Sequence, residues 1–282
     1  MNPLSDRPTL MAVHAHPDDE AISTGGVLAK YASEGVRTVL VTCTDGRCGD
    51  GPGGVKPGEP GHDPDAVVEM RTAELRKSCA TLQISDLETL GYADSGMMGW
   101  PANDAPGAFW TTPVAEAGER VAALMRRYRP DVVVTYDENG FYGHPDHIQA
   151  HRATMAALDL LAPEDAPAKV YWTTVPHSGI RELAARMREN GEGADFPDAE
   201  IPPIGLPDDQ VTTWVDTHGF AAQKYDSLAA HASQTDNTFF LRLGLPAFTD
   251  MFGTETFLRV RDRTGRPADR ETDLFAGIDR PS

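Results

Sequence analysis

The sequence predicts an α/β fold: a Rossmann-like, mainly parallel sheet with flanking helices and a smaller C-terminal α+β portion. Short apolar runs alternate with segments of helical apolar spacing as far as residue 175, which is typical of a parallel sheet. Two nearly identical motifs each follow an apolar run and open a helical segment. No break in composition divides the 282 residues, so we expect one domain, 1–282, in which 1–175 form the core and 176–282 wall the pocket.

Each core element follows from its apolar pattern. The expected strands are short runs rich in apolar and β-branched residues: Leu10–His14, Val36–Cys43, Leu87–Leu90, Asp131–Tyr136 and Lys169–Val175. The expected helices have apolar residues three and four apart: Ala21 to about Gly35, Ala66–Leu82, 113–129 and 145–161. In the C-terminal portion we expect a helix at Arg181–Glu189, followed by an irregular stretch to about residue 210. A strand at Val211–Val215 and a second helix at Ala221–Ala232 are expected to follow.

Two long segments between these elements cannot form regular structure. Asp45–Pro64 is rich in glycine and proline, and Gly91–Trp110 also lacks a periodic pattern. Loops of this length in a compact domain are usually lids or binding loops.

Composition excludes several classes of partner. The formal net charge of −18 argues against nucleic acid and anionic membranes, which require basic surface. No apolar stretch approaches the ~20 residues of a membrane span, and the first residues lack the basic and apolar regions of a signal peptide. Three cysteines without a recognised spacing, Cys43, Cys48 and Cys79, fit a reducing compartment and receive no role. We therefore expect a cytoplasmic protein with a small-molecule partner. Assembly into a homo-oligomer is compatible with the sequence.

The two motifs are His16-Pro17-Asp18-Asp19 and His144-Pro145-Asp146-His147. Because ligand sites of open α/β sheets lie at the carboxyl ends of strands, both turns are expected to meet in one crevice. Proline favours the first helical turn, which places each first histidine on the N-cap side. The acidic residues could merely complement helix N-termini, but two such turns in one sheet favour a divalent metal, a water and a carboxylate base.

The donor types narrow the metal and the reaction. Two imidazoles, one carboxylate and an open position suit catalytic zinc, which lowers the pKa of a water towards 7. The same set also serves non-haem iron(II) oxygenases, so Fe²⁺ could replace Zn²⁺. The additional histidine and aspartates favour hydrolysis, because hydrolysis requires a base for the water and a donor for the developing oxyanion.

With these motifs, the sequence resembles the zinc-dependent de-N-acetylases related to the phosphatidylinositol-GlcNAc deacetylase. Within that family it is most similar to actinobacterial mycothiol-pathway enzymes. Other matching segments extend the resemblance over most of the chain: Tyr136–Gly140, Ala230–Gln234 and Leu274–Gly277. The resemblance implies His16, Asp19 and His147 as zinc ligands and Asp18 as the base that deprotonates the attacking water.

The resemblance also implies roles for five further residues. His144 would be the protonated donor that stabilises the oxyanion and protonates the leaving amine, with Asp146 orienting it. Tyr142 would help to polarise the amide carbonyl. Arg71 and Asp94 would hold sugar hydroxyls.

The predicted reaction is hydrolysis of the N-acetyl amide of an amino sugar, such as N-acetylglucosaminyl-inositol, with release of acetate and a free amine. An amidase that cleaves mycothiol S-conjugates is the nearest alternative. The chain departs from both patterns, because Arg47 stands where the deacetylases tend to have glutamate, and Ser23-Thr24 where the amidases tend to have lysine. A nucleotide-binding Rossmann-type protein is disfavoured, because the first turn lacks a glycine-rich approach to a pyrophosphate. His14 and His231 are interpreted as packed histidines.

Overall fold

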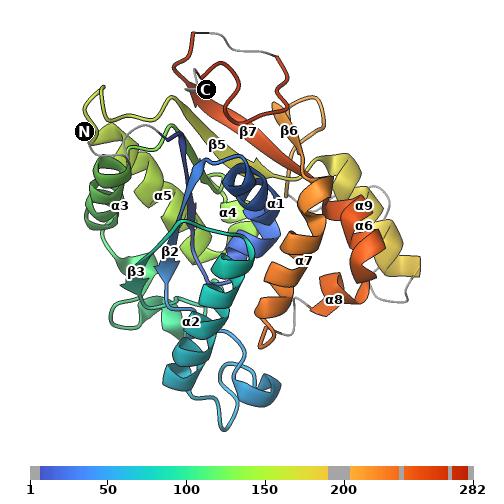
Figure 1. Ribbon diagram of the computed structural model, residues 1–282. Helices are drawn as coiled ribbons and strands as arrows, with labels where there is room; N and C mark the ends of the chain where they lie inside the picture. Colours follow the sequence, from blue (N-terminus) through green and yellow to red (C-terminus); the bar gives the residue numbers. More distant parts are fainter. Residues whose placement is uncertain (1–6, 190–203, 235–237, 266–268, 279–282) are drawn as a thin grey trace.

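The computed structural model describes residues 7–189, 204–234, 238–265 and 269–278, which build an α/β structure around a seven-stranded sheet (Figure 1). The strands are β1 Thr9–His14, β2 Arg37–Thr44, β3 Asp86–Tyr92, β4 Val132–Thr135, β5 Lys169–Thr174, β6 Thr213–Asp216 and β7 Thr254–Asp262. Their order is β3-β2-β1-β4-β5-β7-β6, and β1 to β5 pair in parallel, whereas β7 is antiparallel to both β5 and β6. The predicted mainly parallel sheet is confirmed.

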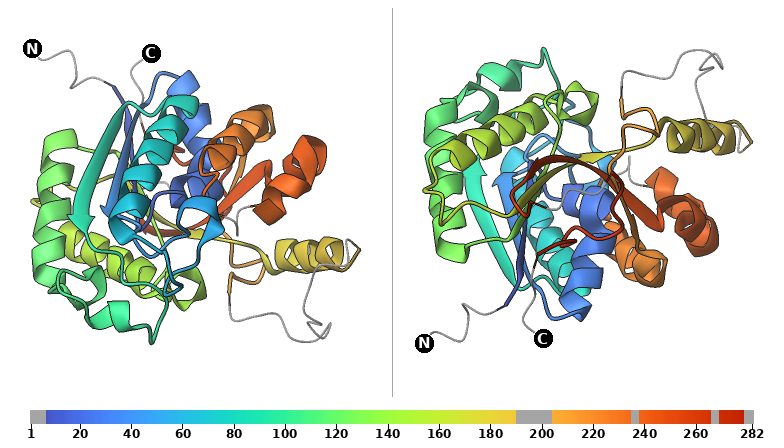
Figure 2. Two further views of the ribbon diagram at one scale, coloured as in Figure 1. Left: turned by 90° about the horizontal axis from the view of Figure 1, so that it is seen from below. Right: turned by 90° about the horizontal axis from the view of Figure 1, so that it is seen from above.

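Helices cover both faces of the sheet. They are α1 Asp19–Ser33, α2 Pro64–Thr81, α3 Val114–Tyr128, α4 Gly140–Gly143, α5 Pro145–Asp159, α6 His177–Glu189, α7 Ala221–Ala230, α8 Thr238–Arg242 and α9 Gly244–Phe252. Short 3₁₀ turns lie at Pro52–Gly54, Pro101–Asp104, Phe109–Thr111 and His218–Phe220. Figures 1 and 2 show α3 and α5 on one face, with α1, α2 and α7 on the other.

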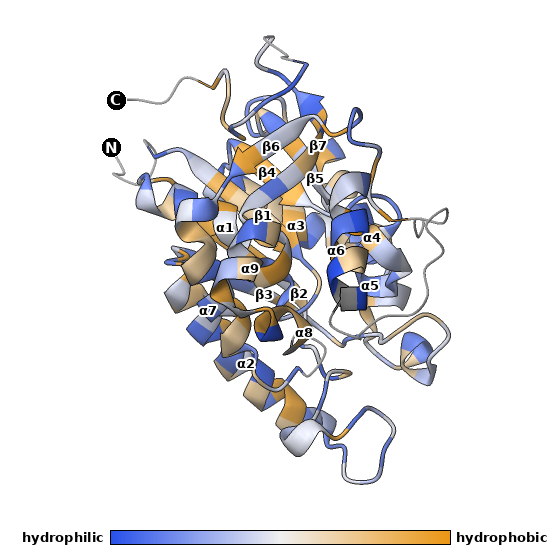
Figure 3. Ribbon diagram, turned by 90° about the vertical axis from the view of Figure 1, so that its right-hand side faces the viewer, coloured by the Kyte–Doolittle hydropathy of each residue, from blue (hydrophilic) through white to orange (hydrophobic). Residues whose placement is uncertain are grey.

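The core strands form because their side chains are buried on both faces. In β1, Met11 and Val13 pack beneath α3 and α5, whereas Leu10 and Ala12 pack beneath α1 and α2. This alternation is the period of two of a pleated strand, and both faces are apolar because helices cover both. Figure 3 shows apolar residues concentrated on the central strands.

The C-terminal portion contains a strand that the sequence pattern did not predict. β7 lies inside the sheet, between β5 and β6, but carries charged residues that interrupt its apolar pattern. The buried Glu255 is paired with Lys224 at 2.7 Å, and the partly buried Arg259 with Glu271 at 2.7 Å, so these charges have partners. Helices α8 and α9 were also missed, and the strand expected from residue 211 begins at Thr213. Residues 190–203 of the expected irregular stretch lie outside the described residues.

The two long segments between elements are loops apart from short 3₁₀ turns, as predicted. Within the described residues, no helix is long and apolar enough to cross a membrane. Because β1 pairs with β2 on one side and β4 on the other, the chain changes direction across the sheet at β1. The first motif follows β1 and the second follows β4. Open α/β sheets bind ligands beside the carboxyl ends of adjacent strands at which the direction changes in this way.

Candidate metal centre and active site

The two motif turns differ in detail. In the second, His144 is the N-cap of α5, its Nδ1 accepts the backbone N–H of Asp146 at 3.1 Å, and Pro145 opens the helix, as predicted. In the first, α1 begins only at Asp19 and its N-cap is Asp18, with φ 119° and ψ −25°. The expectation that His16 lies at the N-cap is therefore wrong by two residues, because Asp18 takes a left-handed conformation that the motif does not reveal.

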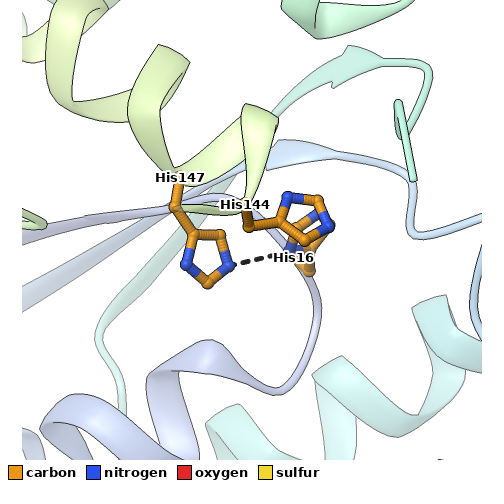
Figure 4. Close-up of side chains that lie close together, drawn as sticks. All are labelled: His16, His144 and His147. Carbon is orange, nitrogen blue, oxygen red and sulfur yellow. Dashed lines mark hydrogen bonds between the residues drawn. The ribbon is translucent and has the colours of Figure 1, made fainter. Parts of the chain in front are cut away.

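The turns bring three imidazoles together. Ring nitrogens of His16, His144 and His147 all lie within 4.8 Å of one another (Figure 4), and all three residues are buried. A second possible donor group is formed by His16, Asp94 and Asp146. These are the kinds of side chain that bind a divalent metal.

The predicted ligand triad has suitable spacing for a metal. His16 Nδ1 lies 3.3 Å from His147 Nε2 and 3.3 Å from Asp19 Oδ2, and His147 Nε2 lies 3.4 Å from Asp19 Oδ1. A tetrahedral zinc with ligand distances of 2.0–2.1 Å places neighbouring ligand atoms about 3.3 Å apart. The spacing of the donor atoms therefore fits such an ion.

The opposite nitrogen of His16 has carboxylate partners. His16 Nε2 lies 3.2 Å from Asp146 Oδ2 and 3.6 Å from Asp94 Oδ1, and Asp146 Oδ2 also accepts the backbone N–H of Ser95 at 2.8 Å. A proton on Nε2, donated to Asp146, leaves the lone pair of Nδ1 directed at the metal position, as in many metal-binding histidines. The Asp146 carboxylate thus orients His16, while its backbone N–H contacts His144.

The electrostatics of the cluster favour a bound cation. Burial alone would lower the pKa of His16, but Asp94, Asp146 and Asp19 raise it well above its usual range. Burial would likewise raise the pKa of Asp19, yet the adjacent His147 and His16 hold it well below its usual range. A concentration of carboxylates that draws a proton onto His16 equally attracts a metal ion.

Asp18 lies beside the proposed ligands and lines the pocket. Burial raises the pKa of its carboxyl, although Arg71, whose Nη2 is 3.2 Å from Asp18 Oδ1, opposes this increase. A raised pKa suits a general base. Arg71 is buried and also donates to the carbonyls of Gly46, at 2.9 Å, and Pro17. Much of its guanidinium is therefore already hydrogen-bonded within the protein.

The surroundings of His144 disfavour the positive charge that the resemblance implies for it. Burial, together with the neighbouring His16 and His147, lowers the pKa of His144 to about 2. Because Nδ1 accepts the Asp146 N–H, the proton of the neutral ring lies on Nε2. The lowered pKa and the bond at Nδ1 therefore favour a neutral His144 that donates from Nε2, whereas the resemblance implies an imidazolium.

Tyr142 and Tyr136 both have ring contacts with His147. Tyr142 is 50% exposed and its ring stands edge-on to His147, with centroids 5.1 Å apart. Tyr136, at the end of β4, was not predicted as a site residue. Its ring stacks on His147 at 4.2 Å, and its hydroxyl donates to Asp19 Oδ2 at 2.7 Å. In the sequence, its position directly after an apolar strand and before the second motif was the signal that could have indicated a site residue.

The centre lies at the base of a pocket of about 610 Å³, a size typical of small-molecule sites. Arg71 and Asp94 both line it, and their predicted contacts with sugar hydroxyls remain predictions. Asp94 is buried and accepts the backbone N–H groups of Gly96, at 2.8 Å, and Cys48, at 3.2 Å. Apolar side chains form part of the lining, among them the exposed Trp100.

The remaining histidines interpreted as packed are buried and hydrogen-bonded. His14 is fully buried, and its Nε2 lies 2.8 Å from Thr24 Oγ1. His231 is 1% exposed, and its Nε2 lies 2.7 Å from Glu20 Oε1. Neither belongs to the metal-binding groups formed by the described residues, which agrees with their interpretation.

Comparison with known proteins identifies the family. Residues 11–158 match the family described as PIG-L: GlcNAc-PI de-N-acetylase. The chain belongs to the PIG-L family. Two curated relatives are named 1D-myo-inositol 2-acetamido-2-deoxy-alpha-D-glucopyranoside deacetylase, and each is 42% identical to this chain. The match to the relative from Acidothermus cellulolyticus covers 96% of this chain and 95% of the relative. The match to the relative from Geodermatophilus obscurus covers 95% of this chain and 97% of the relative.

Solved structures share the fold of this PIG-L protein. The N,N'-diacetylchitobiose deacetylase of Pyrococcus horikoshii is 17% identical with a TM-score of 0.61, covering 92% of this chain and 86% of that one. A 4-carboxy-2-hydroxymuconate hydratase from Pseudomonas putida is also 17% identical, with a TM-score of 0.57, covering 91% and 97%. Since the fold also occurs in a hydratase, the reaction must be inferred from the site.

Proposed function

We propose that this PIG-L protein hydrolyses the N-acetyl amide of an N-acetylglucosaminide, with N-acetylglucosaminyl-inositol as the expected substrate, and releases acetate and a free amine. The observation that carries the proposal is the convergence of His16 Nδ1, His147 Nε2 and Asp19 at 3.3–3.4 Å beside Asp18. The curated relatives of similar length, which are named for deacetylation of this glycoside, support it. The same family membership argues against the nucleotide-binding alternative.

His16, Asp19 and His147 would hold the metal, for which zinc is the expected ion and iron(II) the alternative. When bound, such an ion lowers the pKa of a water and polarises the amide carbonyl. Asp146 keeps the Nδ1 lone pair of His16 directed at the metal position through the 3.2 Å contact with Nε2.

The protein's own groups would then move the protons and stabilise the charge. The Asp18 carboxylate would take a proton from the attacking water, a role that its raised pKa and position in the pocket support. His144 would donate Nε2–H to the developing oxyanion as a neutral ring. Because neutral imidazole is a weak acid, the proton held by Asp18 would be the one delivered to the departing amine.

The test is a deacetylation screen with bound metal measured in parallel. N-acetylglucosaminyl-inositol, a simple N-acetylglucosaminide and a thiol-conjugate amide are compared with wild-type protein and Asp18→Asn. We expect the first substrate to have the highest kcat/KM, and Asp18→Asn to lose about 10²-fold or more in kcat with its metal retained.

Two outcomes would change the proposal. A higher kcat/KM for the thiol-conjugate amide would reassign the protein as an amidase of the S-conjugate class. Near-wild-type turnover by Asp18→Asn would remove Asp18 as the base.

A further inference from the structure

Glu20 is a buried carboxylate directly behind the active-site turn. It is 0% exposed, and its Oε2 accepts the backbone N–H of Asp18 at 3.0 Å. Its Oε1 lies 2.7 Å from His231 Nε2 and also accepts the hydroxyl of Ser78, which is itself 2.7 Å from Ser227 Oγ. Helices α1, α2 and α7 thus all contribute to one buried polar cluster, which we call the Glu20 cluster (Glu20, Ser78, Ser227 and His231).

The residue that this cluster contacts has an unusual backbone. Asp18 has φ 119°, a strained conformation that residues other than glycine rarely adopt. Such a conformation persists only where surrounding contacts hold it. For Asp18 these include the N–H bond to Glu20 and the Ala21 and Ile22 N–H groups that its carbonyl accepts at 3.0 and 3.3 Å.

The two carboxylate oxygens of Glu20 have separate partners. Oε1 contacts His231 and Ser78, and Oε2 accepts the Asp18 N–H. The contacts of α2 and α7 to Oε1 therefore hold the carboxylate that bonds the Asp18 backbone. Neither Glu20 nor His231 lines the pocket, so the cluster contacts the site through the backbone of Asp18.

We propose that Glu20 is a positioning residue for Asp18. Held by His231 and Ser78, it fixes the backbone of Asp18 and so aims the Asp18 carboxylate at the attacking water. This inference rests on the proposed function, in which Asp18 is the general base. A general base must lie within hydrogen-bond reach of its proton, and a displacement of 1 Å can cost about 10²-fold in rate.

The same helix offers a matched control in Glu255. Glu255 is also buried, at 4% exposure, and accepts two backbone N–H groups of α1, those of Gly26 and Val27, both at 2.8 Å. It is paired with Lys224, 2.7 Å away. Removing this carboxylate therefore also breaks a buried ion pair and bonds to α1, but leaves the Asp18 turn intact.

The experiment compares Glu20→Leu, Glu20→Gln and Glu255→Leu in the full-length, metal-loaded protein. We expect Glu20→Leu to lower kcat at least about tenfold, with KM and bound metal close to wild type. Glu20→Gln should restore most of the lost kcat, because its amide oxygen can still accept the Asp18 N–H. Glu255→Leu should lower the melting temperature to a similar extent as Glu20→Leu without lowering kcat.

If Glu20→Leu does not fold, the double variant Glu20→Leu/His231→Leu provides the same measurement without leaving His231 buried and unpaired. A wild-type kcat in whichever of these variants folds, or an equal loss of kcat in Glu255→Leu, would overturn the proposal. Loss of metal from Glu20→Leu would also overturn it, by showing a general disruption of the site. Asp18→Asn in the same assay distinguishes failure of the proposed function from failure of this inference. If Asp18→Asn is active, Asp18 is not the general base. If Asp18→Asn is inactive but Glu20→Leu is active, only the positioning role of Glu20 is refuted.

Discussion

At the scale of single residues, three histidines of similar sequence context differ because of their partners. His16 contacts Asp146 through Nε2, which leaves Nδ1 facing the proposed metal position. His144 accepts the Asp146 N–H at Nδ1 and presents Nε2. His147 stacks on Tyr136 and directs Nε2 at His16 Nδ1. The different tautomers and orientations assign different tasks to chemically identical groups.

His147→Ala should remove bound metal and activity together. The substitution deletes one of three proposed ligands and leaves two, too few to hold a catalytic ion tightly. Metal content measured by elemental analysis, with kcat in the same preparation, provides the check. His151→Ala, which alters the same helix outside the metal-binding groups, is the control. Full metal occupancy in His147→Ala would show that the ligand set is a different one.

His144→Gln should retain metal, lose much of kcat and leave the basic limb of the pH profile of kcat/KM in place. The lowered pKa of His144, about 2, means that the ring is already neutral at any pH well above that value, so it does not titrate on the basic side. Profiles of both proteins from pH 5 to about 10 test this. Disappearance of the basic limb in the variant would instead identify His144 as the acid that the sequence suggested.

At the scale of elements, two strand–turn–helix connections on neighbouring strands form the site. The second turn is tightly packed: Gly140 has φ +61°, and an added Cβ would lie 2.6 Å from the Ile148 backbone nitrogen and 2.8 Å from His147 Cβ. The short segment α4 therefore approaches α5 at the residue proposed to hold the metal. We therefore expect the conformation of this turn to affect the position of His147.

Gly140→Ala should weaken metal binding as well as stability. The left-handed backbone alone costs an alanine about 1–2 kcal/mol, and the clash must in addition displace α5 beside His147. Gly35→Ala is the matched control, because Gly35 has φ +80° with nothing within 4 Å of the added Cβ. Thermal unfolding and metal titration of both variants test the coupling. Equal metal affinity in the two variants would show that the turn does not position His147.

At the scale of the whole molecule, the C-terminal portion completes the sheet that carries the site. β7 pairs with β5, and the segment beyond it returns to the core. Glu271 is bonded there to the buried Lys169 at the start of β5 and accepts the Tyr171 hydroxyl at 2.8 Å. Tyr31 of α1 donates to Asp273 at 2.7 Å. Such links across the chain support the proposal of one domain.

Glu271→Ala should destabilise the entire protein by about 3–5 kcal/mol, because it leaves the buried Lys169 without its nearest partner. Urea unfolding should nevertheless remain a single transition. Fluorescence of Trp214 in β6, with the other three tryptophans replaced by phenylalanine, and metal release from the centre report on the two portions, and their midpoints should shift together. Separate transitions would contradict the one-domain proposal.

Local pattern was sufficient for much of the protein. The parallel strands, most flanking helices and the residues of both motifs follow from strand alternation, helical spacing and proline in a first turn. These signals are readable because each depends on neighbours within a few residues. β7 was missed because its charged residues are neutralised by partners in other elements, such as Lys224, 31 positions from Glu255.

The sequence by itself therefore determined the fold class and the types of donor that meet at the two turns. The tertiary structure decided which atom of each donor faces which partner. Asp146 contacts His16 across 130 positions, and His231 contacts Glu20 across 211. Such pairings depend on how helices and strands pack, and hydrogen-bond direction and pKa depend on the resulting burial and neighbouring charges. No local pattern encodes these distances, so the tautomers, the role of Tyr136 and the Glu20 cluster became visible only in three dimensions.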